Sequence, residues 1–426
     1  MKVFINPSRD IWAEIIKRKK IDDDELRNIV SSILVDVKQN GDAAVKKYCL
    51  QFGKTLLDDL KVNEQEINEA IPFVEEELKN AIKIAKENIE KFHRSQKEEG
   101  RKIETTDGVF CWRKSVAIDR VGLYIPGGTA PLFSTLLMLG IPAIVAGCRE
   151  IIVCTPSDTN GKVNPVILYV AKLLGLKNIY KIGGVQAIAS MAYGTESISP
   201  VYKIFGPGNQ YVTCAKQIIN TEGIAIDMLA GPSEVAVYAD DSCNPAFIAS
   251  DLLSQAEHGI DSQVLLVANS EVIIARVKEE INLQIEFLSR KKIAEQALLN
   301  SRFIVIENIN EAFALLNEYA PEHLIIASDN AEQLSEKVVN AGSVFLGSYS
   351  PESAGDYASG TNHTLPTNGH AKVYSGVSVD SFVKKITFQN LSKKGLQNIG
   401  NTVMEMAGAE GLDAHKNAIS IRLKNL

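Results

Sequence analysis

The fold is decided by residues 121–155, which read VGLYIPGGTAPLFSTLLMLGIPAIVAGCREIIVCT. A short β-rich run at Val121–Ile125 leads through a glycine-rich turn into an apolar run of helical length, Leu132–Ala146. A second β-rich run, Ile151–Thr155, closes the segment. Strands that are buried on both faces of a sheet need continuous apolar sequence of this kind. The stretch therefore predicts a strand, a crossover helix and a second, parallel strand.

The same alternation continues outward from this stretch, at intervals of roughly 25 to 30 residues, which is typical of a parallel α/β sheet. A first series ends near Ile219 and a second begins after Pro232. Two doubly wound units in tandem fit this pattern, and ligands of such sheets bind at the carboxyl ends of the strands. The further elements are Val163–Leu174, Ile179–Ile182, Gln186–Tyr193, Val201–Phe205 and Gln210–Ile219, then Val235–Tyr238, Val264–Val267, Glu271–Leu288, Phe303–Ile306, Glu311–Tyr319, Leu324–Ala327, Ala331–Asn340 and Val344–Leu346.

The two ends of the chain have a different character. Asp22–Asn40 and Asn63–Arg94 carry apolar residues at helical spacing among many Lys and Glu residues, which predicts a helical layer in the N-terminal part. The tail after Leu391 is expected to form one helix and a strand-like stretch at Ala418–Leu423.

The composition is that of an ordinary globular protein, with 45% hydrophobic and 23% charged residues over 426 residues. A net charge of −7 argues against the basic face that nucleic-acid binding requires. No apolar stretch approaches the roughly 20 residues that span a bilayer. The N-terminus, MKVFINPSRD, lacks the apolar core of a secretory signal, so a cytoplasmic protein with free thiols at its six scattered cysteines is expected.

Four glycine-rich turns follow predicted strands. None matches the GxGxxG or P-loop motif, and each alone is ordinary turn chemistry. Glycine at such a junction permits unusual dihedral angles and close approach of the backbone to a ligand. Together they indicate a shared rim that faces a ligand. They are Gly127-Gly128, Gly183-Gly184, Gly206-Pro-Gly208 and Gly231-Pro-Ser233.

Five of the six histidines lie in the C-terminal half, and four of these have other potential ligands nearby in the sequence. His93 and His370 are expected to be structural, as a single loop or helix histidine usually is. The four pairings are His258 with Gln255 and Glu257, His323 with Glu322, His363 with Asp356, and His415 with Glu410 and Asp413.

Nitrogen and oxygen donors that converge from separate segments are typical of a catalytic zinc site with an open position. Gln255 and His258 share a helical face, and a donor set without thiolate also accepts manganese or cobalt. Glu322 and His323 are the acid–base candidates, because adjacent residues at the mouth of a strand can serve two proton transfers. A zinc hydrolase would use similar ligands, but no HExxH is present. A non-catalytic binding module would leave Glu322 and His323 without a purpose.

The motifs resemble those of the histidinol dehydrogenase family over nearly the whole chain. This resemblance implies two Rossmann-like, doubly wound parallel-sheet units of the aldehyde/histidinol dehydrogenase type, with a helical N-terminal part and a small C-terminal tail domain. The similarity is densest in VGLYIPGGTAPLFST, GGVQAIASMAYGT, GPGNQYV, AGPSEV, DLLSQAEHG, YAPEHL, SAGDYASGTNHTLPT and AEGLDAHKNAI.

The resemblance also implies an activity: the four-electron, NAD-dependent oxidation of L-histidinol to L-histidine through L-histidinaldehyde. It implies a homodimer in which the tail reaches the partner's active site, so that Glu410 and His415 serve the neighbouring subunit. The implied zinc ligands are Gln255, His258, Asp356 and His415; the implied NAD contacts are Tyr124, Gln186 and Asn209; the implied substrate contacts are Ser233, Gln255, His258, His323, Asp356, His363, Glu410 and His415.

In this scheme zinc orients the substrate, His323 takes the alcohol proton and Glu322 activates water for the second oxidation. One alternative is another zinc- and NAD-dependent alcohol-to-acid dehydrogenase that acts on a related substrate. A further rival is a thiohemiacetal route through Cys111, Cys148 or Cys154, although the last two flank a predicted buried strand, which favours inert thiols.

We expect the chain to divide into four parts. Residues 1–20 form an N-terminal arm, and residues 21–115 with 233–375 form one α/β unit with its helical layer. Residues 116–232 form the second, inserted α/β unit, and residues 376–426 form the tail.

Overall fold

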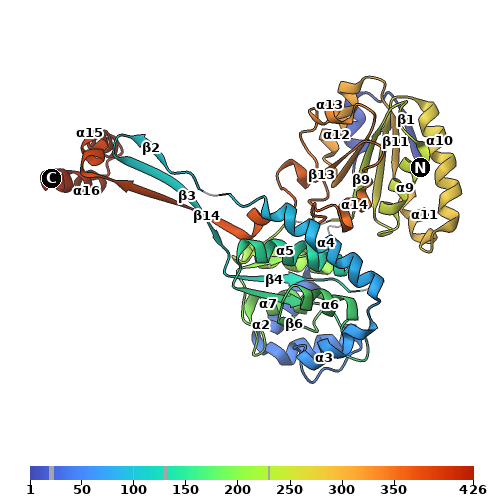
Figure 1. Cartoon of the computed structure of the whole chain (residues 1–426), viewed down its shortest axis with the longest axis horizontal. Coiled ribbons are helices and arrows are strands. Elements are labelled where there is room, and N and C mark those ends of the chain that lie inside the picture. The colour runs from blue at the N-terminus through green and yellow to red at the C-terminus, as the bar shows by residue number, and fades with distance from the viewer. Residues whose placement is uncertain (19–23, 99, 128–131, 229–230) are drawn as a thin grey trace.

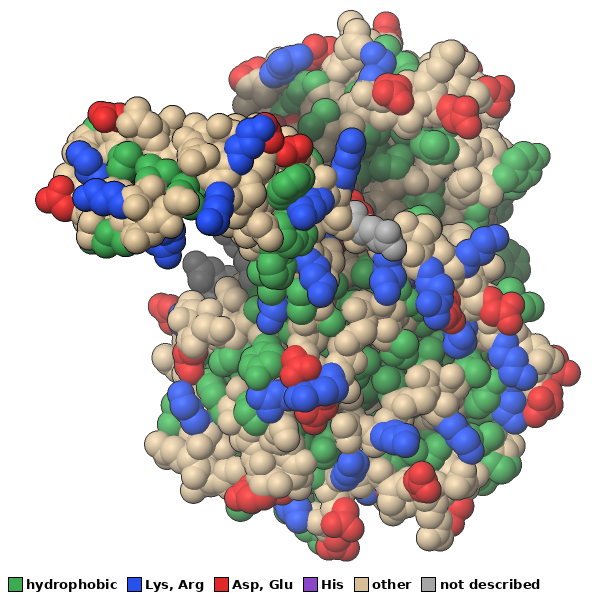
Figure 2. Space-filling view, turned by 60° about the vertical axis from the view of Figure 1, so that its left-hand side comes forward, with side chains coloured by type: hydrophobic (Ala, Val, Ile, Leu, Met, Phe, Trp, Pro, Cys, Tyr) green, Lys and Arg blue, Asp and Glu red, His purple; other side chains and the backbone are tan. Residues whose placement is uncertain are grey.

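The computed structural model of this chain describes residues 1–18, 24–98, 100–127, 132–228 and 231–426. Two bodies, each built on a parallel sheet, lie beside one another, and a long arm projects from one of them (Figure 1). On the face seen in the space-filling view, Asp and Glu side chains are interspersed with Lys and Arg (Figure 2). The predicted parallel α/β architecture is confirmed.

The first body contains a six-stranded parallel sheet. Its two faces bury separate apolar clusters. Val235 and Val237 face α9 (Pro245–Ala256), α10 (Glu271–Gln284) and α11 (Lys291–Leu299), whereas Ala236 and Tyr238 face α1 (Trp12–Ile15) and α12 (Ile309–Tyr319). This alternation is the period-two pattern of a strand covered on both sides. The strand order is β1 (Lys2–Ile5), β11 (Arg302–Val305), β10 (Gln263–Ala268), β9 (Glu234–Ala239), β12 (His323–Ala327) and β13 (Ser343–Leu346).

Helices cover both faces of this sheet. The strand β1 was not expected, because its four residues are too few to show a periodicity, and it is recognised only by its pairing with β11. The helices and turns of this body are η1 (Arg9–Ile11), α1 (Trp12–Ile15), α9 (Pro245–Ala256), α10 (Glu271–Gln284), η3 (Ile285–Phe287), α11 (Lys291–Leu299), α12 (Ile309–Tyr319), α13 (Ala331–Ser335), α14 (Glu352–Tyr357) and η4 (His370–Lys372).

The second body contains a five-stranded parallel sheet in the order β6-β5-β4-β7-β8. The central strand β4 directs Val121 and Leu123 into one apolar cluster and Tyr124 into the other. Its elements are β4 (Arg120–Tyr124), α5 (Phe133–Ala146), β5 (Glu150–Cys154), α6 (Pro165–Leu173), β6 (Asn178–Tyr180), α7 (Gly184–Tyr193), β7 (Lys203–Phe205), α8 (Gln210–Thr221) and β8 (Ala225–Ile226).

The N-terminal helices are α2 (Asp24–Gly53), α3 (Glu64–Ala70), η2 (Ile71–Phe73) and α4 (Glu76–Arg94), as the helical spacing predicted. They pack on the five-stranded body: α2 on α7 and α8, α3 on α6, and α4 on α5. The expected grouping of residues 21–115 with residues 233–375 is therefore wrong for these helices. The apolar stripe of α2, which includes Val30, Leu34 and Val37, shares its cluster with α7 and α8 and not with the six-stranded sheet.

The arm is a three-stranded antiparallel sheet in the order β14-β3-β2, formed by β2 (Ile103–Thr106), β3 (Val109–Ala117) and β14 (Val383–Leu391). Within the arm, β14 follows η5 (Val379–Phe382) and leads to α15 (Lys393–Ala409) and α16 (Asp413–Lys424), which lie at the far end of the arm (Figure 1). The strand expected at Ala418–Leu423 is wrong. Ile419 and Leu423, four residues apart, lie against Gly400 of α15, so this segment presents a helical face.

Within the described ranges, none of the helices has the length and the apolar character needed to cross a membrane.

Candidate functional site

The candidate acid–base pair lies at the amino end of the six-stranded sheet. His323 is the first residue of β12, and in the parallel register it lies opposite Val235 of β9. Both Glu322 and His323 are buried. The expectation that ligand-binding residues gather at the carboxyl ends of the strands is wrong for this sheet. Gln255, near the end of α9, lies at the same amino end, since its amide oxygen accepts from the N–H of Glu234, the first residue of β9.

The backbone of Glu234 contacts both members of this pair. Its N–H donates to Glu322 Oε2 at 2.9 Å, and its carbonyl oxygen lies 3.1 Å from His323 Nδ1. A carbonyl only accepts, so Nδ1 carries the proton and Nε2 is left unprotonated in the neutral ring. His323 Nε2 lies 3.4 Å from Asp356 Oδ1, within ion-pair distance, but makes no hydrogen bond to any described residue. The free nitrogen is thus available to a ligand.

Burial and neighbouring carboxylates shift the pKa values of this cluster. Burial raises the pKa of Glu322 to about 8, against the opposing effect of His323. Burial also favours the neutral form of His323, but Glu352, Glu322 and Asp356 outweigh it and raise its pKa to about 10. Perturbed groups that gather in this way are typical of a functional site.

A possible metal site adjoins the pair. His258, Glu352 and Asp356 each offer a ligand atom, and these atoms lie within 4.8 Å of one another. Glu352 is buried, and its Oε2 makes no hydrogen bond within the described residues. Sequence reasoning missed Glu352. Its position four residues before Asp356 was the available signal, because residues at i and i+4 share the face of a helix, here α14.

Gln255 and His363 border the same cluster. With its amide oriented to satisfy both groups, the Gln255 nitrogen donates to Glu352 Oε1 at 2.5 Å and its oxygen accepts from the Glu234 N–H at 3.0 Å. His363 Nδ1 lies 2.9 Å from the Asp356 carbonyl oxygen, and its Nε2 lies 3.2 Å from Thr135 Oγ1. Since Thr135 lies in the first turn of α5, this contact joins the cluster to the five-stranded body. Ser233 is partly exposed and immediately precedes β9.

Two of the expected residues are not brought into this cluster by their own chain. Glu410 follows α15, His415 lies in α16, and both are exposed at the far end of the arm (Figure 1). His93 is buried, with Nδ1 at 2.8 Å from Ile89 O and Nε2 at 3.3 Å from Asn362 Nδ2, which fits the structural role expected for it.

The expected cofactor contacts follow strands of the five-stranded sheet. Tyr124 ends β4, and its hydroxyl accepts from the Gly184 N–H at 3.1 Å. Gln186 is buried in α7, and Asn209 caps α8 by accepting from two backbone N–H groups at 3.1 Å each. The three residues therefore lie at the carboxyl edge of this sheet, from which α5 with Thr135 also starts.

A buried ion pair fixes the glycine turn after β7. Lys216 Nζ pairs with Asp227 Oδ1 and donates to the carbonyl of Gly206 at 2.9 Å. Asp227 Oδ2 accepts from the Gly206 N–H at 2.8 Å. Gly206 has a φ of 125°, and a Cβ at this position would lie 2.0 Å from the Tyr124 carbonyl oxygen. The ends of β4 and β7 therefore approach each other in a way that only glycine permits.

The thiols do not support the thiohemiacetal route. Burial raises the pKa of Cys148 to about 12 and that of Cys154 further still, which keeps both in the unreactive protonated form. Cys111 lies in β3 of the arm.

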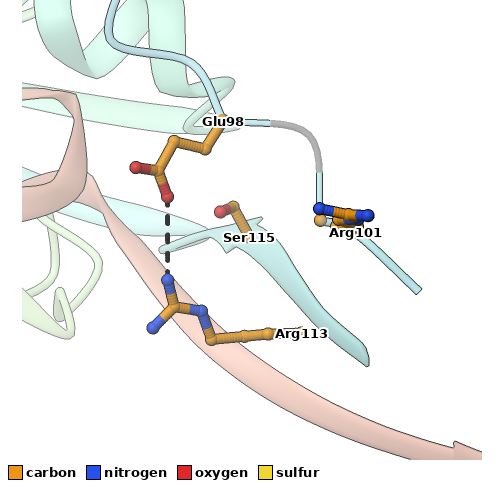
Figure 3. Close-up of a pocket in the computed structure, with 5 residues that line it drawn as sticks. Glu98, Arg101, Arg113 and Ser115 are labelled. Carbon is orange, nitrogen blue, oxygen red and sulfur yellow. Dashed lines mark ion pairs between the residues drawn. The ribbon is translucent and has the colours of Figure 1, made fainter. Parts of the chain in front are cut away.

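A separate cavity of about 200 Å³ lies where the arm begins and is lined by Glu98, Gly100, Arg101, Arg113 and Ser115 (Figure 3). Glu98 and Arg113 form an ion pair at 3.6 Å across it. None of its lining residues belongs to the His/Glu/Asp cluster, so this cavity carries no part of the candidate site.

Comparison with known proteins gives one consistent result. A family model described as histidinol dehydrogenase matches residues 16–423. The histidinol dehydrogenase of Bacteroides thetaiotaomicron is 57% identical over 426 residues, which cover 100% of both chains. That of Campylobacter jejuni (strain RM1221) is 49% identical, with 100% of this chain and 99% of the relative covered. The crystal structure of histidinol dehydrogenase from Elizabethkingia anophelis matches with a TM-score of 0.98 and 56% identity, over 100% of this chain and 98% of that chain.

Proposed function

Because this chain belongs to the histidinol dehydrogenase family, and is thus an oxidoreductase of histidine biosynthesis that acts on histidinol, we propose the finer steps of its reaction. L-histidinol is oxidised to L-histidinaldehyde and then to L-histidine, with NAD as oxidant and zinc as the ion that orients the substrate. The observation that carries this proposal is the buried Glu322–His323 pair, which the backbone of one residue holds, with His323 Nε2 beside a three-residue donor set.

The residues present fit a zinc ion. His258, Glu352 and Asp356 offer nitrogen and oxygen donors, and a buried carboxylate oxygen of Glu352 lacks a partner within the described residues. We propose Gln255, His258 and Asp356 as ligands, with His415 of a second copy of this chain as the fourth. In this arrangement Glu352 holds the Gln255 amide nitrogen, and the Gln255 oxygen, which accepts from the Glu234 N–H, would offer its second lone pair to the ion. The bound ion would anchor the imidazole and amine nitrogens of histidinol.

In the first oxidation, His323 Nε2 accepts the proton of the substrate alcohol. The Glu234 carbonyl holds the Nδ1 proton, which fixes the tautomer in which Nε2 is the base. A cation held beside Asp356 and Glu352 would counter the carboxylates that raise the pKa of His323, and so favour the neutral ring that a base requires. His363 and Ser233, with Glu410 of the second copy, complete the proposed substrate contacts.

In the second oxidation, Glu322 in its ionised form acts as the base for the water that adds to the aldehyde, so this step should speed up as the pH rises through the Glu322 pKa of about 8. The Glu234 N–H binds one carboxylate oxygen of Glu322 and leaves the other for the water. NAD would accept a hydride at each step.

The proposed function is tested by product stoichiometry. The protein with zinc, NAD and histidinol should produce two NADH for each histidine formed, followed by absorbance and by chromatography of the amino acid. A chelator should abolish this activity, and added zinc should restore it, because the donor set has no thiolate to retain metal by itself. Production of histidine without NADH, or none at all with metal restored, would contradict the proposal.

We further propose that Tyr124, Gln186 and Asn209 line the NAD site, beside the turn that Lys216 and Asp227 hold. Replacing only one residue of the Lys216–Asp227 ion pair would leave the other charge buried without a partner, which would lower the stability of the protein by about 3–5 kcal/mol. The test therefore replaces both residues. A Lys216→Met/Asp227→Leu variant should raise the KM for NAD about tenfold, roughly the loss of one interaction, and leave the KM for histidinol unchanged.

A matched control for this change is Lys38→Met/Glu222→Gln, which removes an exposed ion pair of the same body at 3.2 Å. Steady-state kinetics with each substrate varied separately checks the expectation. An equal rise in both KM values, or none in either, would place the NAD site elsewhere.

A further inference from the structure

The N-terminal segment places one guanidinium group beside the start of β9. Arg18 forms a two-point ion pair with Glu234, through Nε to Oε1 and through Nη2 to Oε2 at 2.8 Å. The two side chains are only 15% and 2% exposed. Because a buried carboxylate is costly unless it is paired, the fork of Arg18 provides the partner that Glu234 needs to remain charged.

The same pair links three segments of the site. Arg18 Nη2 also donates to the Tyr319 carbonyl at 2.8 Å, and the guanidinium lies over the Tyr319 ring, 3.9 Å from its centroid. Glu234 Oε1 accepts from the Asn368 N–H at 3.0 Å. Tyr319 ends α12 three residues before Glu322, and Asn368 follows His363 by five residues. The start of β9, the end of α12 and the loop after His363 therefore converge on one ion pair.

The backbone of Glu234 then contacts both acid–base side chains, as described above. Any residue at position 234 would offer the same N–H and carbonyl groups. What the charged side chain adds is a fixed position for the backbone at residue 234, since the far end of the side chain is held at two points by Arg18 and at a third by Asn368.

We propose that Arg18 and Glu234 are positioning residues, whose side chains hold the Glu234 backbone in the orientation that aligns Glu322 and His323 with the substrate. The proposal rests on the function proposed for these two residues. A displacement of about 1 Å at a reacting group can lower a rate on the order of a hundredfold, so loss of the pair should appear in kcat.

The test uses a charge-balanced variant, Arg18→Met/Glu234→Gln, which leaves no buried charge unpaired and keeps an acceptor for the Asn368 N–H. It should fold with a Tm near that of the wild type, bind zinc in the same amount, and lower kcat about tenfold for both histidinol and histidinaldehyde. The KM for histidinol should change less than about threefold, because none of the proposed metal ligands is replaced and Glu352 still holds the Gln255 amide. Arg18→Lys, which keeps the charge but loses the fork, should give an intermediate kcat.

Arg9→Met is the matched control, because Arg9 lies in the same N-terminal segment and makes a two-point pair with Glu311 at 2.8 and 2.6 Å on the surface. It should leave kcat unchanged. A double variant with kcat within about twofold of the wild type would overturn the positioning role, and so would a parallel loss of zinc, Tm and kcat. If instead the wild type made no NADH from histidinol, the proposed function itself would fail, so the two failures are distinguishable.

Discussion

A Glu322→Gln variant is expected to convert histidinol to histidinaldehyde and then to stop. The amide has nearly the same shape as the carboxylate and can still accept from the Glu234 N–H, but it cannot take a proton from water. General-base catalysis contributes about 10²- to 10⁴-fold, so oxidation of supplied histidinaldehyde should fall by that factor. Oxidation of histidinol to the aldehyde should stay within about tenfold of the wild type, because we propose His323 as the base for that proton transfer.

The measurement is a single-turnover assay with each substrate, in which NADH and histidine are quantified separately. Glu318→Gln is the matched control, since Glu318 lies on the preceding helix and forms an exposed pair with Lys372 at 3.0 Å. Histidine formed from histidinaldehyde by the Glu322 variant at the wild-type rate would mean that Glu322 is not the base.

A His415→Ala variant is expected to lose most of its zinc and its activity, although His415 is exposed and distant from the cluster in its own chain (Figure 1). The loss of one ligand should cost more than the 10- to 100-fold seen for groups that only orient ligands. Since we propose that His415 completes the site of a second copy, an equal mixture of His415→Ala and Glu322→Gln chains should regain the formation of histidine from histidinol, which neither variant performs alone. Half of the dimers would be mixed, and each would hold one intact site, which gives roughly a quarter of the wild-type rate.

This complementation is measured after the two variants are co-expressed with different tags. Asn417→Ala, two positions further along α16, serves as the control and should retain activity and zinc. If His415 acts within its own chain, every site in a mixed dimer carries one defect, and the mixture forms no histidine.

The sequence predicts most of the two sheets because their strands are short apolar runs. The IIVC segment of β5 and the LIIA segment of β12 contain few polar residues, so their burial on both faces is visible without a structure. The partner of a helix is not visible in this way. The apolar stripe of α2 predicts that one face of the helix is buried, but it does not predict which of the two similar α/β bodies the helix packs against.

For the candidate site, too, local sequence patterns were informative and long-range contacts were not. Residue types and spacing indicated His258, Glu322, His323 and Asp356, because carboxylates next to histidines are informative by themselves. Arg18 could not be found in this way, since its partner Glu234 lies 216 positions away. Glu352 could have been found from its spacing to Asp356. The location of the site at the amino end of the six-stranded sheet could not have been predicted from the sequence. It depends on the contact between Gln255, near the end of α9, and Glu234 of β9, which only the folded chain shows.

The antiparallel arm has a consequence for the order in which the chain can fold. β3, at residues 109–117, pairs along its whole length with residues 383–391. During synthesis, β3 leaves the ribosome long before its partner exists, so one edge of the β2–β3 hairpin stays unpaired until the chain is nearly complete. Open strand edges are templates for aggregation, and pairings between distant residues form slowly. A chain that stopped short of residue 383 would keep both parallel sheets and still expose this edge permanently.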